Sequence, residues 1–185
     1  MDTHKRPPAY TQDSAGILQN LRTSSNGLTT QEAQRRLALN GPNELAVSTK
    51  AKNFVNRLFG RRVNNTIAMI KVTRDGKTKK IPADQLVIGD LVHLHKGDIV
   101  PAEIRLMKTK NLVIQNDNFI KRDAIKKDAD AILPANSSID EQINMAYSSA
   151  IVKKGSGTGI VTATSLDEEA ASVSNPAEDY NISII

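Results

Sequence analysis

Residues 81–106 read IPADQLVIGDLVHLHKGDIVPAEIRL, and this run contains two Gly-Asp pairs, Gly89-Asp90 and Gly97-Asp98. Such pairs are typical of turns, because glycine adopts backbone conformations that other residues avoid. Leu91–Leu94 lies between the two pairs and is apolar apart from one histidine. Ile104–Met107 is a second short run that is apolar apart from Arg105. The stretch therefore predicts short strands that are separated by tight turns.

The sequence on either side extends this strand pattern. Ile67–Thr73 and Thr78–Ile81 flank Asp75-Gly76, and such a pair supplies the positive φ angles of a two-residue hairpin turn. Further short strands are predicted at Leu112–Ile114, Ala150–Lys153 and Gly159–Ala163.

Helices are predicted mainly before these strands. Ser14 is a candidate cap for a short helix that runs to Leu21, and Thr29 or Thr30 caps a clearer one that ends at Gly41. Brief helices are also predicted near Ile139–Ser148 and at Asp167–Val173. Many short strands with few helices predict a mainly β fold, a sandwich or a distorted, double-stranded β-helix-like jelly roll, with a small N-terminal helical subdomain.

The composition is that of a folded soluble protein. The chain has 185 residues with 39% hydrophobic and 24% charged residues, and it has no cysteine, which excludes disulfides and thiol catalysis. No apolar run approaches the roughly 20 residues that a membrane span needs, and the polar residues 1–12 do not resemble a signal peptide. We therefore expect a soluble, cytoplasmic protein.

The net charge of +5 is unevenly distributed. Residues 50–80 contain ten basic side chains and one acid, whereas residues 165–185 contain five acids and no base. Aromatic residues make up only 3% of the chain, so few side chains are present on which nucleic-acid bases could stack. We therefore expect no specific nucleic-acid partner. The charge distribution and the predicted helices and strands divide the chain into five parts. These are a disordered tail (1–13), a helical segment (14–45), a basic linker or amphipathic helix (46–66), a β domain (67–174) and a C-terminal tail (175–185).

Three parts of the sequence resemble one family. The run 81–106, with its double Gly-Asp turn followed by Val-Pro-Ala and an acid, is similar to the actuator domain of P-type cation-transporting ATPases. Asn144–Ser149 and Lys154–Thr164 resemble the second half of that domain. Gly27–Ala33 and Asn40–Leu45 resemble the N-terminal helical segment of these pumps, especially of calcium and fungal sodium pumps.

The sequence departs from the family in two ways. The pumps place a transmembrane hairpin where this chain has only residues 46–66, and the phosphorylated Asp-Lys-Thr-Gly motif is absent from the sequence. The hydrolytic loop of the family, Asp-x-Ser-x-Leu-Thr-Gly-Glu-Ser, falls on residues 115–123, which read QNDNFIKRD. In this register the glutamate becomes Arg122 and the glycine becomes Lys121. Because arginine stays protonated, it cannot act as a general base.

We therefore expect neither ATPase nor aspartyl-phosphatase activity. A shift of one residue would place Asp123 at the position of the glutamate, although without the preceding glycine. The altered loop is rich in cations and is a candidate site for an anionic small molecule, a lipid head group or a phosphorylated protein partner. Its candidate binding residues are Ile120, Lys121, Arg122, Asp123, Lys126 and Lys127. A solvated surface loop without a ligand is the alternative.

A second candidate surface lies in the basic linker. The spacing in residues 52–62 places four apolar side chains on one helical face, namely Phe54, Val55, Leu58 and Phe59. Flanking cations would suit weak peripheral contact with an anionic membrane. Packing of the same face against the β domain is the alternative.

Two further motifs are interpreted as structural. His93 and His95 point to the same side of a predicted strand, as metal ligands would, but the sequence supplies few candidates for a third ligand, so we expect no metal. The glycine-rich run Gly155–Gly159 precedes a strand, whereas a phosphate-binding loop would open a helix. We expect a strand bend there, and no cofactor.

These observations favour a stand-alone, catalytically altered actuator-like domain that acts as a binding or regulatory module. The alternative is an enzyme recruited to a new pocket on the actuator fold, for example in a fungal metabolic pathway. An engineered chain from which the membrane hairpin was excised is a third hypothesis.

Overall fold

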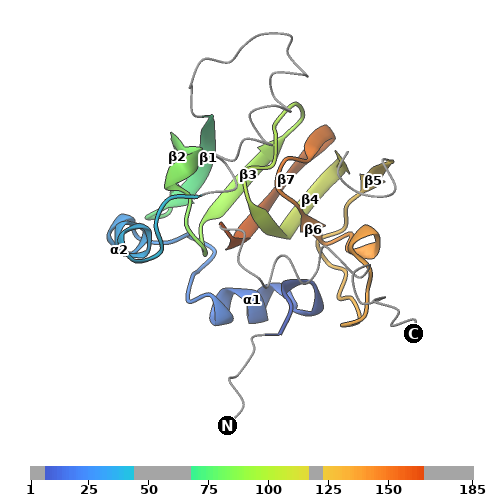
Figure 1. The fold of residues 1–185 in the computed structure, drawn as a ribbon, viewed down its shortest axis with the longest axis horizontal. Coiled ribbons are helices and arrows are strands. Elements are labelled where there is room, and N and C mark those ends of the chain that lie inside the picture. Colours follow the sequence, from blue (N-terminus) through green and yellow to red (C-terminus); the bar gives the residue numbers. More distant parts are fainter. Residues whose placement is uncertain (1–6, 44–67, 117–122, 165–185) are drawn as a thin grey trace, which may run out of the picture.

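The computed structural model describes residues 7–43, 68–116 and 123–164, and this part of the chain is mainly β (Figure 1). Two helices, α1 (Ser14–Asn20) and α2 (Thr30–Asn40), precede the strands. The strands are β1 (Met69–Arg74), β2 (Lys77–Pro82), β3 (Leu91–His95), β4 (Glu103–Gln115), β5 (Ala124–Lys126), β6 (Met145–Ala146) and β7 (Ile151–Ala163). Single 3₁₀ turns occur at Ala9–Thr11, Ala83–Gln85 and Ile139–Glu141. None of the helices in the described ranges is long and apolar enough to span a membrane.

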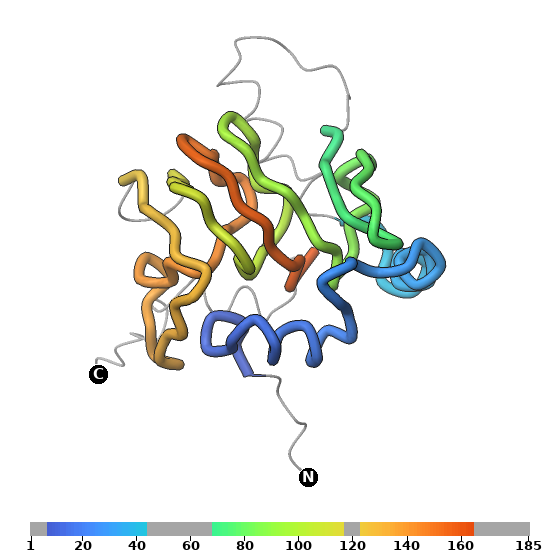
Figure 2. Tube along the Cα trace, turned by 180° about the vertical axis from the view of Figure 1, so that it is seen from behind, coloured from blue at the N-terminus to red at the C-terminus, as the bar shows by residue number. Residues whose placement is uncertain are grey.

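All seven strands form one antiparallel sheet. Its order is β2-β1-β3-β7-β4-β5, and the short β6 pairs with β4. The tube in Figure 2 shows the sheet from behind, with the N-terminal helical segment beneath one end of it. The prediction of a mainly β fold with an N-terminal helical part is confirmed.

The two longest strands correct the predicted strand boundaries. Ile104–Met107 and Leu112–Ile114 belong to one strand, β4, and Ala150–Lys153 and Gly159–Ala163 both fall largely in β7. Register shifts interrupt the β4–β7 pairing, and they include one between Lys110 and Val113. Near it Asn111 has a φ of 51° and Gly155 a φ of 75°. A local irregularity of this kind is a β-bulge, which bends a strand without ending it.

The hairpin and the second helix form as predicted. Asp75 and Gly76 have φ angles of 55° and 69° between β1 and β2. The Thr29 hydroxyl accepts a hydrogen bond from the Glu32 backbone N–H over 3.1 Å, and α2 ends at Gly41, whose φ is 77°. The cap of α1 is Asp13 rather than Ser14, because the Asp13 carboxylate accepts the Gly16 N–H at 2.7 Å.

The predicted helix at Ile139–Ser148 is wrong. Only Ile139–Glu141 is helical, as a single 3₁₀ turn, and the chain then enters β6. The side chain of Asn144 donates to the backbone carbonyls of Tyr10 and Ala131, both at 2.8 Å. These long-range bonds hold the segment in an irregular conformation that no local propensity predicts. The predicted helix at 167–173 lies outside the described residues.

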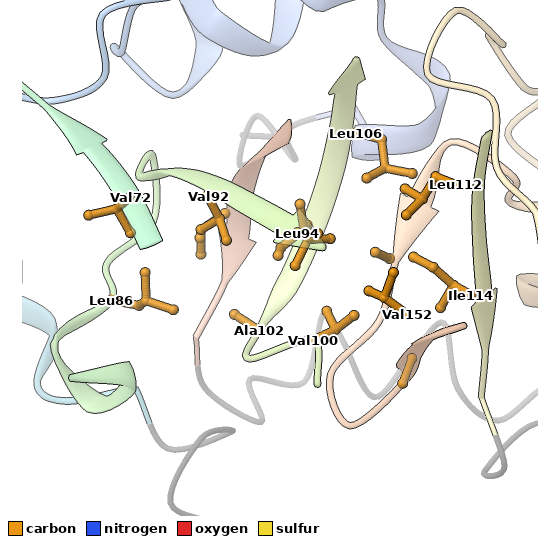
Figure 3. Close-up of a cluster of buried hydrophobic side chains, with 14 of the residues drawn as sticks. Val72, Leu86, Val92, Leu94, Val100, Ala102, Leu106, Leu112, Ile114 and Val152 are labelled. Atoms are coloured by element: carbon orange, nitrogen blue, oxygen red, sulfur yellow. The ribbon is translucent and has the colours of Figure 1, made fainter. Parts of the chain in front are cut away.

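Each face of the sheet has its own apolar cluster. Figure 3 shows the larger cluster, to which Val72 of β1, Val92 and Leu94 of β3 and Val152 of β7 all contribute. On the opposite face, Ile17 and Leu21 of the α1 region pack against Ile160 of β7. This arrangement explains how a chain without tryptophan builds a core from aliphatic side chains.

A buried ion pair lies where β1 meets the turn before β3. The Arg74 guanidinium donates to both carboxylate oxygens of Asp90, at 2.7 and 2.6 Å, and Asp90 is completely buried. The same carboxylate accepts the Val87 N–H at 3.0 Å, and Arg74 also donates to the Gln85 carbonyl. The aspartate of the first Gly-Asp turn is therefore a structural residue.

A second buried arginine joins the N-terminal segment to β4. Arg105 is completely buried, and its guanidinium donates to the carbonyls of Ala9, Gln12, Ala129 and Ala131 at 2.8–3.2 Å. Burial lowers its pKa, and the carbonyl oxygens satisfy a charge that has no carboxylate in contact among the described residues. This residue fixes α1 and the 129–131 loop to the sheet.

We predict that Asp90→Asn lowers the free energy of unfolding by about 3–5 kcal/mol, because it leaves the Arg74 charge buried without a counter-ion. Urea unfolding followed by circular dichroism measures the loss. Asp98→Asn, at an exposed turn, is the matched control and should cost less than about 1 kcal/mol. The double variant Arg74→Met/Asp90→Leu should be more stable than Asp90→Asn alone. Equal effects at positions 90 and 98 would contradict this account.

Candidate functional site

The altered loop connects two paired strands at one edge of the sheet. Gln115 pairs with Ala124 and Val113 pairs with Lys126, so β4 and β5 bring the two ends of the loop together. Asn116 is the last described residue before the loop, and Asp123 is the first after it. The predicted binding residues Ile120, Lys121 and Arg122 lie outside the described residues. The structure therefore places the base of the predicted site.

The two predicted lysines after the loop differ in their surroundings. Lys126 is exposed on the edge strand β5. Lys127 is only 7% exposed; its backbone N–H donates to the Leu112 carbonyl at 2.9 Å, and its Nζ donates to the Gln142 carbonyl at 3.4 Å. Burial lowers the pKa of Lys127 to about 8, while the Asp140 carboxylate acts in the opposite direction. Lys126 faces solvent, whereas Lys127 is an interior amine.

A small cavity lies at the base of the loop. It is lined by Ile114, Asn116, Asp123, Ile125, Lys127, Tyr147 and Ala150. The Tyr147 hydroxyl donates to the side-chain carbonyl of Gln142, and burial raises the pKa of this tyrosine. The cavity has room for about one water molecule, and Lys127, whose amine carries several N–H donors, can donate a hydrogen bond to a group placed there. Tyr147 lies about twenty residues beyond the loop, and nothing in its local sequence predicted that it would be here.

Glu103 is a second buried ionisable group that the sequence analysis missed. Its Oε2 atom has no hydrogen-bond partner, although the Ser148 backbone N–H donates to the carboxyl group. Burial raises the pKa of Glu103 from 4.5 to about 7. The residue is the acid that follows Val-Pro-Ala, so the motif marked its position but not its burial.

The two histidines lie on one face of β3, as predicted. His93 pairs with Thr158 and His95 with Ser156. Nε2 of His93 is 2.8 Å from the Thr73 hydroxyl, and burial together with the charges of His95 and Lys71 lowers the His93 pKa. Within the described ranges no three His, Asp or Glu side chains are grouped as a metal site would require.

The glycine-rich run lies inside β7, so its interpretation as a strand bend is confirmed. A Cβ atom at Gly159 would lie 2.3 Å from Cγ2 of Ile104, and one at Gly157 would lie 2.8 Å from Cδ2 of Leu112. These glycines allow β7 to pack closely on β4, and they do not form a phosphate cradle. The predicted apolar face of Phe54, Val55, Leu58 and Phe59 lies outside the described residues.

Comparison with known protein families gives two matches. Residues 64–178 match the P-type ATPase actuator domain, and residues 9–70 match the N-terminus of cation transporters and ATPases. The first match takes in β1 to β7, including both ends of the loop.

Individual relatives are ion pumps. A cation-transporting ATPase of Synechocystis is 39% identical over 107 residues, which is 58% of this chain and 12% of the relative. The sodium/potassium exporting P-type ATPase of Schizosaccharomyces pombe is 38% identical over 109 residues, 57% of this chain and 10% of the relative. The probable cation-transporting ATPase F of Mycobacterium tuberculosis is 30% identical over 200 residues, 80% of this chain and 22% of the relative. The chain thus spans less than a quarter of the length of each of these relatives.

We predict that Glu103→Gln removes a pH dependence of stability. Because the folded carboxyl group has a pKa of about 7, the native state holds a proton between pH 4.5 and 7 that the unfolded chain releases. The wild type should therefore lose stability as the pH rises through this range, by roughly 1–3 kcal/mol. Urea unfolding at pH 5 and pH 8 measures the difference, which should shrink in Glu103→Gln. An unchanged difference would contradict the burial of this group.

Proposed function

The chain belongs to the P-type ATPase family through its actuator domain, and from this premise we propose that it is a catalytically altered actuator module that binds an anionic group. The binding loop would be the β4–β5 connection, with Lys121 and Arg122 at the positions of the glycine and the glutamate in the family motif. The observation that supports this most strongly is the charge reversal at Arg122 within an otherwise matching domain.

The surroundings of the loop support binding rather than hydrolysis. Arginine presents a planar set of donors that grips a phosphate or carboxylate in two places, and it does not release its proton to activate water. Lys126 is exposed on the adjoining strand and adds a second cation at the rim. Asp123 and Lys127 both line the cavity at the base of the loop.

The short basic stretch at residues 46–66, where the family's pumps carry a transmembrane hairpin, supports a separate module. The alignment with the M. tuberculosis ATPase extends over 200 residues but takes in only 80% of the 185 residues here, so the relative carries residues that this chain lacks. We propose that the chain acts as a regulatory or binding partner, in the cytoplasm, which actuator domains face in full-length pumps. We also propose a fungal source. We further propose that the strands follow a jelly-roll arrangement, because the bulges in the β4–β7 pairing would allow these strands to bend as such a fold requires.

One observation favours the alternative, a recruited enzyme. A buried lysine with a pKa of about 8 is neutral in roughly one fifth of the molecules at pH 7.4, and neutral amines act as bases or nucleophiles. Lys127 lines the cavity together with Asn116 and Tyr147. The cavity has room for about one water molecule, so the alternative requires it to open around a small carbonyl substrate.

We predict that the protein does not hydrolyse acetyl phosphate, a small acyl phosphate, but binds phosphate-type anions. Pyrophosphate titrated into ¹⁵N-labelled protein at low salt should shift the amide signals of Asp123 and Lys126. Lys121→Ala/Arg122→Ala should weaken this binding at least tenfold and leave the fold intact. Lys77→Ala/Lys96→Ala removes the same charge at two exposed positions, the start of β2 and the turn after β3, and is the control.

Two outcomes would overturn the proposal. Turnover of acetyl phosphate that is lost in Asp123→Asn would restore the hydrolytic function. Equal pyrophosphate affinity in the two double variants would show that charge in general, and not this loop, holds the anion. Loss of a carbonyl-directed activity in Lys127→Met would support the alternative.

A further inference from the structure

A row of cations crosses the sheet far from the altered loop. Lys80 on β2 pairs with Lys71 on β1, and because Val72 pairs with Val92, Lys71 lies opposite His93 on β3. His93 pairs with Thr158 on β7, which in turn pairs with Lys108 on β4. Residues that are paired across strands project from the same face. Five neighbouring positions therefore carry three lysines and a histidine on one face.

A second row lies beside the first. His95 on β3 pairs with Ser156 on β7, and Ser156 pairs with Lys110 on β4. We call the side chains of Lys71, Lys80, His93, His95, Lys108 and Lys110 the basic face. All of them except the half-buried His93 are exposed.

The basic face is the uncovered half of the sheet surface on which α1 packs. Ile17 and Leu21 cover the neighbouring row, which contains Leu91 and Ile160. Figure 1 shows α1 beneath one end of the sheet, and the basic face lies on the strands beyond it. This half of the surface consequently has no helix over it in the described part of the chain.

The lysines of this face lack counter-ions in the described residues. Within that part of the chain, the ion pairs of the sheet are Arg74–Asp90, Lys79–Asp75 and the contact of His95 with Asp98, and none includes Lys71, Lys80, Lys108 or Lys110. Like charges that are directly opposite across two strands destabilise a sheet, as at Lys71 and Lys80. Such an arrangement gains stability when an acidic group binds over it.

The chain itself contains a segment of opposite charge. Residues 165–185 carry Asp167, Glu168, Glu169, Glu178 and Asp179 and no base. The described structure ends at Thr164, directly after β7, the strand in the middle of the basic face. Thr158 lies about 20 Å back along β7, and an extended chain from Thr164 to Glu178 reaches about 45 Å.

We propose that the acidic segment 165–185 binds the basic face within the same chain. Tethering makes the encounter intramolecular, with an effective concentration in the millimolar range, so weak exposed ion pairs are sufficient. The bound acidic segment would cover the lysines of the basic face and keep other anionic groups from them. The bound fraction would fall at high salt, because salt screens exposed charges. The proposal does not depend on the β4–β5 loop or on what that loop binds.

A spin label tests the contact directly. The chain has no cysteine, so Ser172→Cys provides a unique attachment site for a nitroxide between the two groups of acids. At low salt we expect the label to broaden the amide signals of Lys71, His93, Thr158 and Lys108 in the 185-residue chain, and 0.5 M salt should remove this broadening.

Two charge variants act as control and test. Lys71→Gln/Lys108→Gln should abolish the broadening, whereas Arg22→Gln/Lys77→Gln, which removes two exposed cations outside the basic face, should preserve it. Broadening centred on Asp123 and Lys126, or none at low salt, would overturn the proposal. In a mixture of spin-labelled unenriched protein and unlabelled ¹⁵N-protein, broadening as strong as within one chain would also overturn it, because the contact would then join two copies.

A membrane is the competing occupant. Vesicles of phosphatidylserine and phosphatidylcholine should bind the variant Asp167→Asn/Glu168→Gln/Glu169→Gln at least threefold more strongly than the wild type, because the basic face is then less shielded. Equal binding of both proteins to these vesicles would contradict occupancy by the acidic segment.

Discussion

The buried pair of Arg74 and Asp90 is the constraint on which the rest of the structure depends. Asp90 is completely buried, and its carboxylate joins β1 to the turn that starts β3. The backbone of the same turn exchanges hydrogen bonds with Val161 of β7, at 2.8 and 2.9 Å. A buried charge without its counter-ion would strongly lower the stability of the fold. Arrangements of the three strands that separate Arg74 from Asp90 are therefore disfavoured. Arg105 then attaches the N-terminal segment to the sheet.

We call the Arg74–Asp90 pair, Arg105 and the strands that they join the frame. The stability of the domain depends on this frame, whereas the chemistry depends on the loop. The ion pair joins β1 to the turn before β3, Arg105 of β4 holds the N-terminal segment and the 129–131 loop, and the aliphatic core is built largely on β1, β3, β4 and β7. Among the described residues, those at the two ends of the altered loop belong to or adjoin the short β4–β5 pair at an edge of the sheet. We therefore expect substitutions in the loop to leave these buried contacts in place, in a chain that still matches the actuator domain.

Local sequence patterns predicted those helices and turns whose conformation is set by neighbouring residues in the sequence. Asp75-Gly76 specified the hairpin through positive φ angles, and Thr29 specified the start of α2 through a side-chain cap. The same patterns gave wrong predictions where hydrogen bonds to residues distant in the sequence determine the conformation. Asn144 is held by Tyr10 and Ala131, so the segment around it is not a helix. At the candidate site, sequence identified Asp123 and Lys126, but the burial of Lys127 and the approach of Tyr147 arise only from the packing of β4, β5 and β6.

The independence of the frame from the loop is tested most directly by restoring the family motif. The variant Ile120→Thr/Lys121→Gly/Arg122→Glu/Asp123→Ser replaces the loop and leaves every buried contact described above. Amide hydrogen exchange should then show unchanged protection throughout β1, β3, β4 and β7, apart from residues next to the loop. A general loss of protection across these strands would contradict the account, because it would show that the altered loop is part of what holds the domain together.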